Sequence, residues 1–267
     1  MSRTASKALS FAAAVALSAC GGGDSADAGA RVLCASCGAG VGSGSPPSSP
    51  VAAQAGTAEG YWNGTAGGYA FSTVILTDGT TFAAYSRAGL IEGVSIGQVT
   101  SNAGSISGKL TDYNGPLLAV TPATVSGTYV ARQSLNLSLR VGSLAYSLQA
   151  AYDPTYDTEV RLSDFAGAWS GTGGSRDGVG AVSFNIATNG AVSGATRACQ
   201  FAGLAMPVVT GKHPLRVDLT FSGSGCPLAG RSVAGIAVAA QSGARQQLLV
   251  AGALADGSDG FFGLAGR

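Results

Sequence analysis

The sequence predicts an all-β protein with two tandem antiparallel meander domains, each a barrel-like unit of about eight strands, after a signal peptide and a disordered Gly/Ser/Pro linker. Low charge (11% of residues) and abundant glycine (42 residues) accompany many short Val, Ile, Leu and Tyr runs, which favours strands over helix bundles. These runs recur at roughly ten-residue spacing without an amphipathic helix between them. The only two tryptophans share the motif G-x-W-x-G-T, 107 residues apart, and this repeat indicates a duplicated domain.

Residues 1–19 have the pattern of a secretory signal peptide. Arg3 and Lys7 form a positive start, the segment from Ala8 to Leu17 is apolar apart from one serine, and small residues follow it. The apolar segment is shorter than the roughly 20 residues that a helix needs to cross a bilayer. We therefore expect export and cleavage rather than a membrane-spanning helix.

The end of this segment, Leu17-Ser18-Ala19-Cys20, resembles the lipobox of bacterial lipoproteins. The resemblance implies that Cys20 becomes the N-terminus and carries acyl chains such as palmitate, of which two or more anchor a protein stably in a membrane. Gly21 stands where the family's inner-membrane retention signal has Asp. The resemblance therefore implies a lipid anchor in the outer membrane, at its periplasmic face or at the cell surface. An ordinary cleaved signal peptide, with Cys20 incidental, is the alternative.

Residues 20–58 follow as a flexible linker of Gly, Ala, Ser and Pro with almost no large apolar side chains. Within it, Cys34 and Cys37 form a C-x-x-C pair. A redox pair would need a βαβ context, and a zinc site would need two further ligands although His213 is the only histidine. In an oxidising envelope compartment we expect a local disulfide instead.

The first β-domain is expected at residues 59–157 and begins with Gly60, Trp62 and Gly64 of the repeated motif. Asp78-Gly79 predicts a tight hairpin turn, because these residue types accept positive φ. The strict alternation that begins at Ser134 indicates one buried and one solvated face. The expected strands after the motif are 69–76, 81–85, 93–99, 105–110, 124–130, 134–141 and 144–151.

The second β-domain is expected at residues 158–267 and begins with Gly167, Trp169 and Gly171 of the second motif. Pro154, near the boundary, interrupts the strand pattern. A further hairpin signal, Asn-Gly, follows the first of the expected strands, which are 181–186, 191–195, 200–204, 215–221, 233–239, 247–253 and 260–265.

Cys199 and Cys226 occur in the second domain. In a secreted chain they most simply form a disulfide, which closes a loop of about 28 residues and stabilises the fold by roughly 3–4 kcal/mol. With Cys20 lipidated, the five cysteines then divide into one anchor and two pairs.

The motif G-x-W-x-G near a first strand resembles that of lipocalin- and avidin-like barrels, in which the Trp packs under the first strand and closes one end. With a lipidated cysteine, a Gly-rich tether and tandem small barrels, the chain resembles surface lipoproteins of the transferrin-binding or factor H-binding type, and uncharacterised two-domain lipoproteins of proteobacteria. The resemblance covers the lipobox and the two Trp motifs. It implies an architecture and no particular ligand.

We expect no catalytic residues, no metal and no cofactor. Gly93-Val94-Ser95-Ile96-Gly97 matches the nucleophile elbow G-x-S-x-G, but no helix is expected after Ser95. The sole histidine, His213, lies in the other domain and is expected in a surface loop. A chance match in a chain rich in Gly and Ser is the favoured interpretation.

Two further groups of side chains each have two interpretations. Acidic residues between the domains either bind a cation such as Ca²⁺ or belong to a solvated linker, which is favoured; they are Asp153, Asp157, Glu159 and Asp164. Four aromatic residues either line a ligand cavity or plug the cores, which is favoured; they are Tyr61, Trp62, Tyr113 and Trp169.

The leading functional hypothesis is a noncatalytic outer-membrane lipoprotein that binds a protein partner or a small-molecule ligand through its β-domains. A structural or assembly component of the cell envelope is the alternative. An enzyme is disfavoured because no set of base, nucleophile and orienting residue can be assembled. Nucleic-acid binding is not expected, because 15 basic and 14 acidic side chains leave the chain near neutral without a basic stripe.

Overall fold

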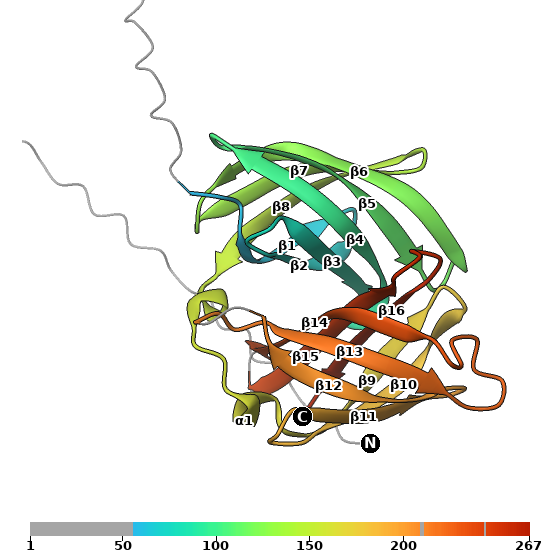
Figure 1. The fold of residues 1–267 in the computed structure, drawn as a ribbon. Coiled ribbons are helices and arrows are strands. Elements are labelled where there is room, and N and C mark those ends of the chain that lie inside the picture. Colours follow the sequence, from blue (N-terminus) through green and yellow to red (C-terminus); the bar gives the residue numbers. More distant parts are fainter. Residues whose placement is uncertain (1–55, 209–210, 243) are drawn as a thin grey trace, which may run out of the picture. The chain divides into compact units, whose positions relative to one another are not determined.

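The computed structural model of the protein describes residues 56–208, 211–242 and 244–267. In this part of the chain the strands close into two barrels of eight antiparallel strands, coloured blue to green and yellow to red in Figure 1. The predicted all-β fold class, two tandem meander barrels, is therefore confirmed. Within the described residues, no helix has both the length and the apolar character needed to cross a membrane.

Barrel 1 is a simple meander in which every strand pairs with its neighbour in sequence and the last strand pairs with the first. Its strands are β1 (Gly60–Ala66), β2 (Tyr69–Ile75), β3 (Thr80–Arg87), β4 (Leu90–Asn102), β5 (Ser105–Asn114), β6 (Ala119–Val130), β7 (Ser134–Val141) and β8 (Leu144–Asp153). In such a meander alternate turns lie at the same end.

A short connection leads into barrel 2, which has the same meander order and closes by pairing its last strand with its first. The connection holds the 3₁₀-helix η1 (Pro154–Asp157) and the helix α1 (Leu162–Phe165). The strands are β9 (Gly167–Ser175), β10 (Gly178–Ile186), β11 (Ala191–Thr196), β12 (Gln200–Pro207), β13 (Leu215–Ser222), β14 (Ser232–Ser242), β15 (Arg245–Leu254) and β16 (Gly260–Gly266).

Each predicted strand is present, but β4 and β6 are longer than the apolar pattern indicated. The hydrogen-bonded ladder of β4 and β5 runs to the pair Asn102 and Ser105, and that of β5 and β6 runs to Asn114 and Ala119. These ends carry polar and small residues. Periodicity therefore identified only the buried middle of each strand, because strand ends beyond the core need no apolar side chains.

The two copies of the Trp motif play the same structural role. Trp62 Nε1 donates a hydrogen bond to the carbonyl of Ala58 (3.0 Å), and Trp169 Nε1 donates to that of Phe165 (2.7 Å), four residues upstream in each case. Both indoles are fully buried, each in the core of its own barrel. Burial of the ring together with a paired N–H is the usual state of tryptophan in a core.

The second glycine of each motif allows two strands to approach closely. A Cβ on Gly64 would lie 2.1 Å from the carbonyl oxygen of Gln149, and a Cβ on Gly171 would lie 2.1 Å from that of Leu264. Any side chain would therefore push the first strand away from the last, at the seam where each barrel closes. The repeated Gly is needed for closure.

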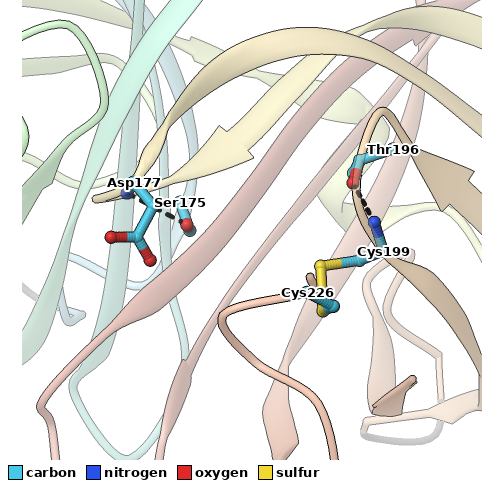
Figure 2. Close-up of a disulfide and its surroundings, with 5 residues drawn as sticks. All are labelled: Ser175, Asp177, Thr196, Cys199 and Cys226. Carbon is cyan, nitrogen blue, oxygen red and sulfur yellow. Dashed lines mark hydrogen bonds between the residues drawn. A yellow bond between two sulfur atoms is a disulfide. The ribbon is translucent and has the colours of Figure 1, made fainter. Parts of the chain in front are cut away.

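A disulfide joins Cys199 and Cys226, as predicted, with an S–S distance of 2.06 Å (Figure 2). It links the turn before β12 to the loop between β13 and β14. Thr196 Oγ1 accepts a hydrogen bond from the backbone N–H of Cys199 (3.1 Å), which fixes the turn on one side of the bond (Figure 2).

A third apolar cluster joins the outer walls of the two barrels. Side chains of β2 to β5, among them Val74 and Phe82, are buried with side chains of β14 to β16, among them Ile236 and Phe262. Tyr113 OH also donates a hydrogen bond to the carbonyl of Gly257 (3.1 Å). The described residues of the two barrels accordingly belong to one compact unit.

Candidate ligand-binding site

Barrel 1 has an open end, opposite its buried Trp62, where a pocket of about 360 Å³ enters the interior. We call this the mouth pocket. Side chains of β2, β3 and β5 to β8, together with the turns after β5 and β7, form its wall. The lining residues are Tyr69, Phe71, Tyr85, Asp112, Asn114, Leu117, Ala119, Thr121, Leu139, Val141, Gly142, Ser143, Leu144 and Tyr146.

The strand registers place the deeper lining residues on the inner face. Phe71 is paired with Tyr85 across β2 and β3, and Asp112 is paired with Thr121 across β5 and β6. Directly paired residues point to the same side of a sheet. The chain therefore presents these side chains to one cavity, although they are far apart in the sequence.

Four aromatic rings stand together in the mouth pocket, and we call them the aromatic group: Tyr69, Phe71, Tyr85 and Tyr146. The ring of Tyr69 meets those of Tyr85 and Tyr146 edge to face, with centroids 5.7 and 6.3 Å apart. The rings of Phe71 and Tyr85 are tilted, with centroids 5.7 Å apart. Aromatic rings at such separations hold one another in place, so the wall of the pocket is ordered.

Asp112 lies at the deep side of the pocket and is only 4% exposed. One carboxylate oxygen accepts a hydrogen bond from Ser95 Oγ (2.7 Å), and the other accepts one from Tyr85 OH (3.2 Å). Burial raises the pKa of Asp112 above its usual value, because the charged form is poorly solvated, and the two hydroxyl bonds offset this only in part. Among the described residues that line the pocket, it is the only charged one.

A chain of hydrogen bonds connects the carboxylate to the edge of the pocket. Asn114 Nδ2 donates to Tyr85 OH (3.0 Å), and Asn114 Oδ1 accepts from the backbone N–H of Leu117 (2.8 Å) in the turn after β5. Gly93 leaves room for this arrangement, because a Cβ there would lie 2.2 Å from the Tyr85 oxygen. The position of the carboxylate is therefore coupled to the turn at the entrance.

Large apolar side chains are exposed at the end of barrel 1 that carries the entrance. Leu117 and Leu118, after β5, are 70% and 64% exposed, and Leu144, at the start of β8, is 53% exposed; Leu117 and Leu144 line the pocket. Leu90, the first residue of β4, lies at the same end and is 55% exposed. We call these four residues the leucine rim. Exposed leucines gathered at a pocket entrance are typical of a site that meets an apolar ligand or partner.

Barrel 2 has no comparable opening among its described residues, because phenylalanines fill its interior. Phe201 lies within 5.3 to 5.4 Å, between ring centroids, of Phe184, Phe221 and Phe261. All four are buried. The larger hollow on this barrel, of about 880 Å³, is an open depression bordered largely by small polar side chains, which offers less enclosure than the mouth pocket.

The predicted G-x-S-x-G match acquires a structural explanation. Ser95 lies in the middle of β4, is fully buried and binds Asp112, so it is not on a strand-to-helix turn. Gly93, two residues before Ser95, makes room for the Tyr85 hydroxyl. Gly97, two residues after it, lies against the next strand, and a Cβ there would be 2.2 Å from the carbonyl oxygen of Lys109. The motif shapes the floor of the mouth pocket.

The prediction that His213 lies in a surface loop was wrong. His213 is 6% exposed, its Nε2 bonds the carbonyl of Ala239, and its Nδ1 lies 3.1 Å from Thr158 Oγ1. Burial lowers its pKa below the usual value. Its partners lie in the connection and in β14, so the contact that buries it is tertiary and has no local sequence signal.

Two of the four acidic residues between the barrels, Asp153 and Asp157, are engaged by protein groups. Asp157 accepts from Lys212 Nζ (2.8 Å), from Arg132 Nη2 (3.2 Å) and from Tyr152 OH (2.7 Å). Asp153 caps η1 through the backbone N–H of Thr155. Across residues 56–208, 211–242 and 244–267, no group of three or more His, Cys, Asp or Glu side chains is arranged to hold a metal ion.

The four aromatic residues singled out in the sequence do not line the mouth pocket. Trp62 and Trp169 fill the cores, whereas Tyr61 and Tyr113 belong to the cluster between the barrels. The aromatic group that does line the pocket was missed. Its signal was the alternation of Tyr69 with Phe71 at the start of β2, which marks an aromatic inner face. Cys20, Cys34 and Cys37 lie outside the described residues.

Fold and pocket together define a two-barrel β-protein with one aromatic-lined cavity. No family model and no curated protein matches the chain. A DUF3598-family protein of unknown function from Nostoc punctiforme is similar over 79% of this chain and 94% of its own, with 12% identity and a TM-score of 0.28. Transferrin Binding Protein B from Haemophilus parasuis is similar over 74% of this chain and 50% of its own, with 12% identity and a TM-score of 0.27. Such low scores determine neither the fold nor the function of this chain.

Proposed function

We propose that this protein is a noncatalytic, lipid-anchored binding protein of the outer membrane, and that barrel 1 holds its ligand. The observation that carries the proposal is the mouth pocket, which is open, apolar over most of its wall and polar at one deep point. Ligand sites are typically concave and mostly apolar with a few placed polar groups, and barrel mouths are a preferred location.

The anchor is the part of the proposal that rests on the sequence. Residues 1–19 would be removed, Cys20 would be lipidated, and residues 20–58 would tether the domains 59–157 and 158–267 at the periplasmic face or the cell surface. Metabolic labelling with a palmitate analogue should tag the wild type and not Cys20→Ser. Label retained in Cys20→Ser would contradict the anchor, and protease shaving of intact cells would distinguish the two faces.

Binding is tested with N-phenyl-1-naphthylamine, a neutral apolar probe that fluoresces when it leaves water. The full-length chain is used as Cys20→Ser, so that no acyl group requires detergent. Thr121 lies on the pocket wall, and Thr121→Trp should fill the cavity and weaken probe binding at least about tenfold, which corresponds to 1.4 kcal/mol. Thr188→Trp, at an exposed position of barrel 2 that lines neither the mouth pocket nor the depression on that barrel, is the matched control and should bind as the parent does. Absence of probe binding by the folded parent would contradict the proposal.

The leucine rim favours a second candidate, a protein partner docked on the open end of barrel 1. Leu117 and Leu118 are adjacent and both largely exposed, whereas exposed apolar residues on a surface without a partner usually occur singly. Replacing both by Ser would abolish capture of such a partner while leaving the interior of the pocket intact. If Leu117→Ser/Leu118→Ser binds the probe as tightly as the parent does, the cavity binds small apolar molecules without these two leucines.

A further inference from the structure

The wall of the mouth pocket contains one carboxylate, Asp112, and no basic side chain. Within the described part of the chain, the neutral hydroxyls of Ser95 and Tyr85 are the only groups that hydrogen-bond to Asp112. Arg87, a basic residue at this end of the barrel, is engaged by Glu92 (3.7 Å) and by Tyr69, whose ring its guanidinium covers at 4.1 Å. A buried carboxylate without a cation is costly unless it is neutralised.

Barrel 2 contains a buried carboxylate that has more hydrogen-bond donors than Asp112 and a basic neighbour. Asp259 is also buried, at 2% exposure, but it accepts backbone N–H bonds from Arg176 (3.1 Å) and Gly260 (2.7 Å) and lies 3.7 Å from the Arg176 guanidinium. Asp112 has neither a backbone donor nor a cation among the described residues. Burial raises the pKa of both carboxyl groups, but only Asp259 has backbone donors and a guanidinium beside it among the described residues.

The aromatic group is suited to the same kind of ligand. Tyr69, Phe71, Tyr85 and Tyr146 line the same pocket as the carboxylate, and Arg87 already covers one face of the Tyr69 ring. The negative faces of aromatic rings attract organic cations, and cages of such rings recognise ammonium groups. Burial keeps Tyr85 protonated by raising its pKa, so its hydroxyl remains a donor to Asp112 and adds no second negative charge.

We propose that the mouth pocket selects amphipathic organic cations, with an ammonium head beside Asp112 and the aromatic group, and an apolar tail passing out between the leucines of the rim. This inference rests on the proposed function, since it names the class of ligand for the same pocket. An ammonium head satisfies the carboxylate, the rings add cation–π attraction, and the rim covers the tail. Every distinctive feature of the pocket then has a role.

The test compares three ligands with the same tail and different heads: octyltrimethylammonium, 1-octanol and octanoate. Each displaces N-phenyl-1-naphthylamine from the full-length Cys20→Ser chain. We expect the cation to bind at least about tenfold more tightly than 1-octanol, and octanoate to bind most weakly, because its charge repels Asp112. Equal affinity for the cation and 1-octanol, or tighter binding of octanoate, would overturn the inference.

Two variants assign the preference to named groups. Asp112→Asn keeps the size of the side chain and should remove the advantage of the cation over 1-octanol. Asp218→Asn removes a carboxylate that is 40% exposed on barrel 2 and should change nothing. Tyr146→Leu keeps an apolar wall without a π face and should weaken the cation about three- to thirtyfold, with little change for 1-octanol.

The outcomes separate this inference from the proposed function. If all three octyl ligands displace the probe without preference for the cation, the pocket binds ligands and the inference fails. If the folded parent binds no probe and no octyl ligand, the proposed function and the inference fail together. Retention of the cation preference in Asp112→Asn would also overturn the inference, and circular dichroism of each variant checks that the barrels remain folded.

Discussion

The two barrels are built on one plan and differ in how their interiors are filled. Opposite the buried tryptophan, the neighbouring strand carries Thr73 in barrel 1 and Phe184 in barrel 2. Thr73 Oγ1 is buried without a hydrogen-bond partner among the described residues. In barrel 2 a glycine, Gly263, makes room for the larger ring, since a Cβ there would lie 2.8 Å from Phe184.

Under the proposed function, barrel 1 provides binding and barrel 2 provides stability. The phenylalanines of barrel 2 occupy the space that barrel 1 leaves for its mouth pocket. Barrel 2 also has the Cys199–Cys226 disulfide and a carboxylate, Asp259, held beside an arginine. Barrel 1 retains an uncompensated carboxylate and exposed leucines. Groups of this kind cost stability and are retained at binding sites.

The largest expected effect comes from opening the filled interior. Phe201→Ala should lower the free energy of unfolding by about 3–5 kcal/mol, because a closed core cannot collapse around the lost ring. Phe71→Ala, in the wall of the mouth pocket, should cost less, about 2 kcal/mol, because water can enter the new space. Urea unfolding followed by tryptophan fluorescence measures both. An equal loss would mean that barrel 1 is packed as tightly as barrel 2.

Removal of the disulfide should have the next largest effect. Cys199→Ser/Cys226→Ser should lose about 2–4 kcal/mol of stability, because the unfolded chain gains freedom between the two positions. A reducing agent should destabilise the wild type by a similar amount and leave the double variant unchanged. Non-reducing mass spectrometry should first show the linked peptides, and free thiols at both positions would rule out the bond in the purified protein.

The repeated motif predicts matched effects in the two barrels. Trp62→Phe and Trp169→Phe should each lose about 2 kcal/mol, because each leaves a buried carbonyl without its N–H donor and shortens a core side chain. Each variant retains one tryptophan as a fluorescent reporter in the other barrel. If the two losses in the free energy of unfolding differ by more than about twofold, the two tryptophans do not stabilise their barrels equally.

The smallest expected effect is a change in pH dependence. Folding raises the pKa of Asp112 from its usual value of 3.8, so over the range above 3.8 the folded chain keeps a proton that the unfolded chain has lost. Stability from this group is therefore present at low pH and declines as the pH rises through that range. Tyr85, the titratable group in contact with Asp112, stays protonated because burial raises its pKa.

Asp112→Asn removes this titration from barrel 1. The free energy of unfolding of the Asp112→Asn variant should decline less than that of the wild type between about pH 4 and pH 7, as measured by urea unfolding at several pH values. A bound organic cation should have the same effect on the wild type, because it stabilises the charged form. Parallel pH profiles of the wild type and the variant would indicate that Asp112 is solvated in solution.

The sequence alone determined the fold class, the position of nearly every strand and the equivalence of the two tryptophans. These features are local or periodic: alternation such as that of Leu135, Leu137 and Leu139 depends on the pleat of one strand. The pairing of Cys199 with Cys226 followed from the count of cysteines and the expected compartment. The ends of β4 and β6 were missed because they show no clear alternation: β4 begins with two adjacent apolar residues, Leu90 and the buried Ile91, and β6 contains Pro122 near its start.

Only the tertiary structure decided which barrel is open. Tyr69, Tyr85, Asp112 and Tyr146 come from four strands and meet because the meander closes into a barrel and sets each register. The same closure buries His213 against Ala239 and gives Ser95 a carboxylate partner. No single segment contains this information, because a pocket is a volume left between side chains of many strands. Sequence periodicity indicates which side chains face inward, and the volume that they leave unfilled depends on how all the strands pack together.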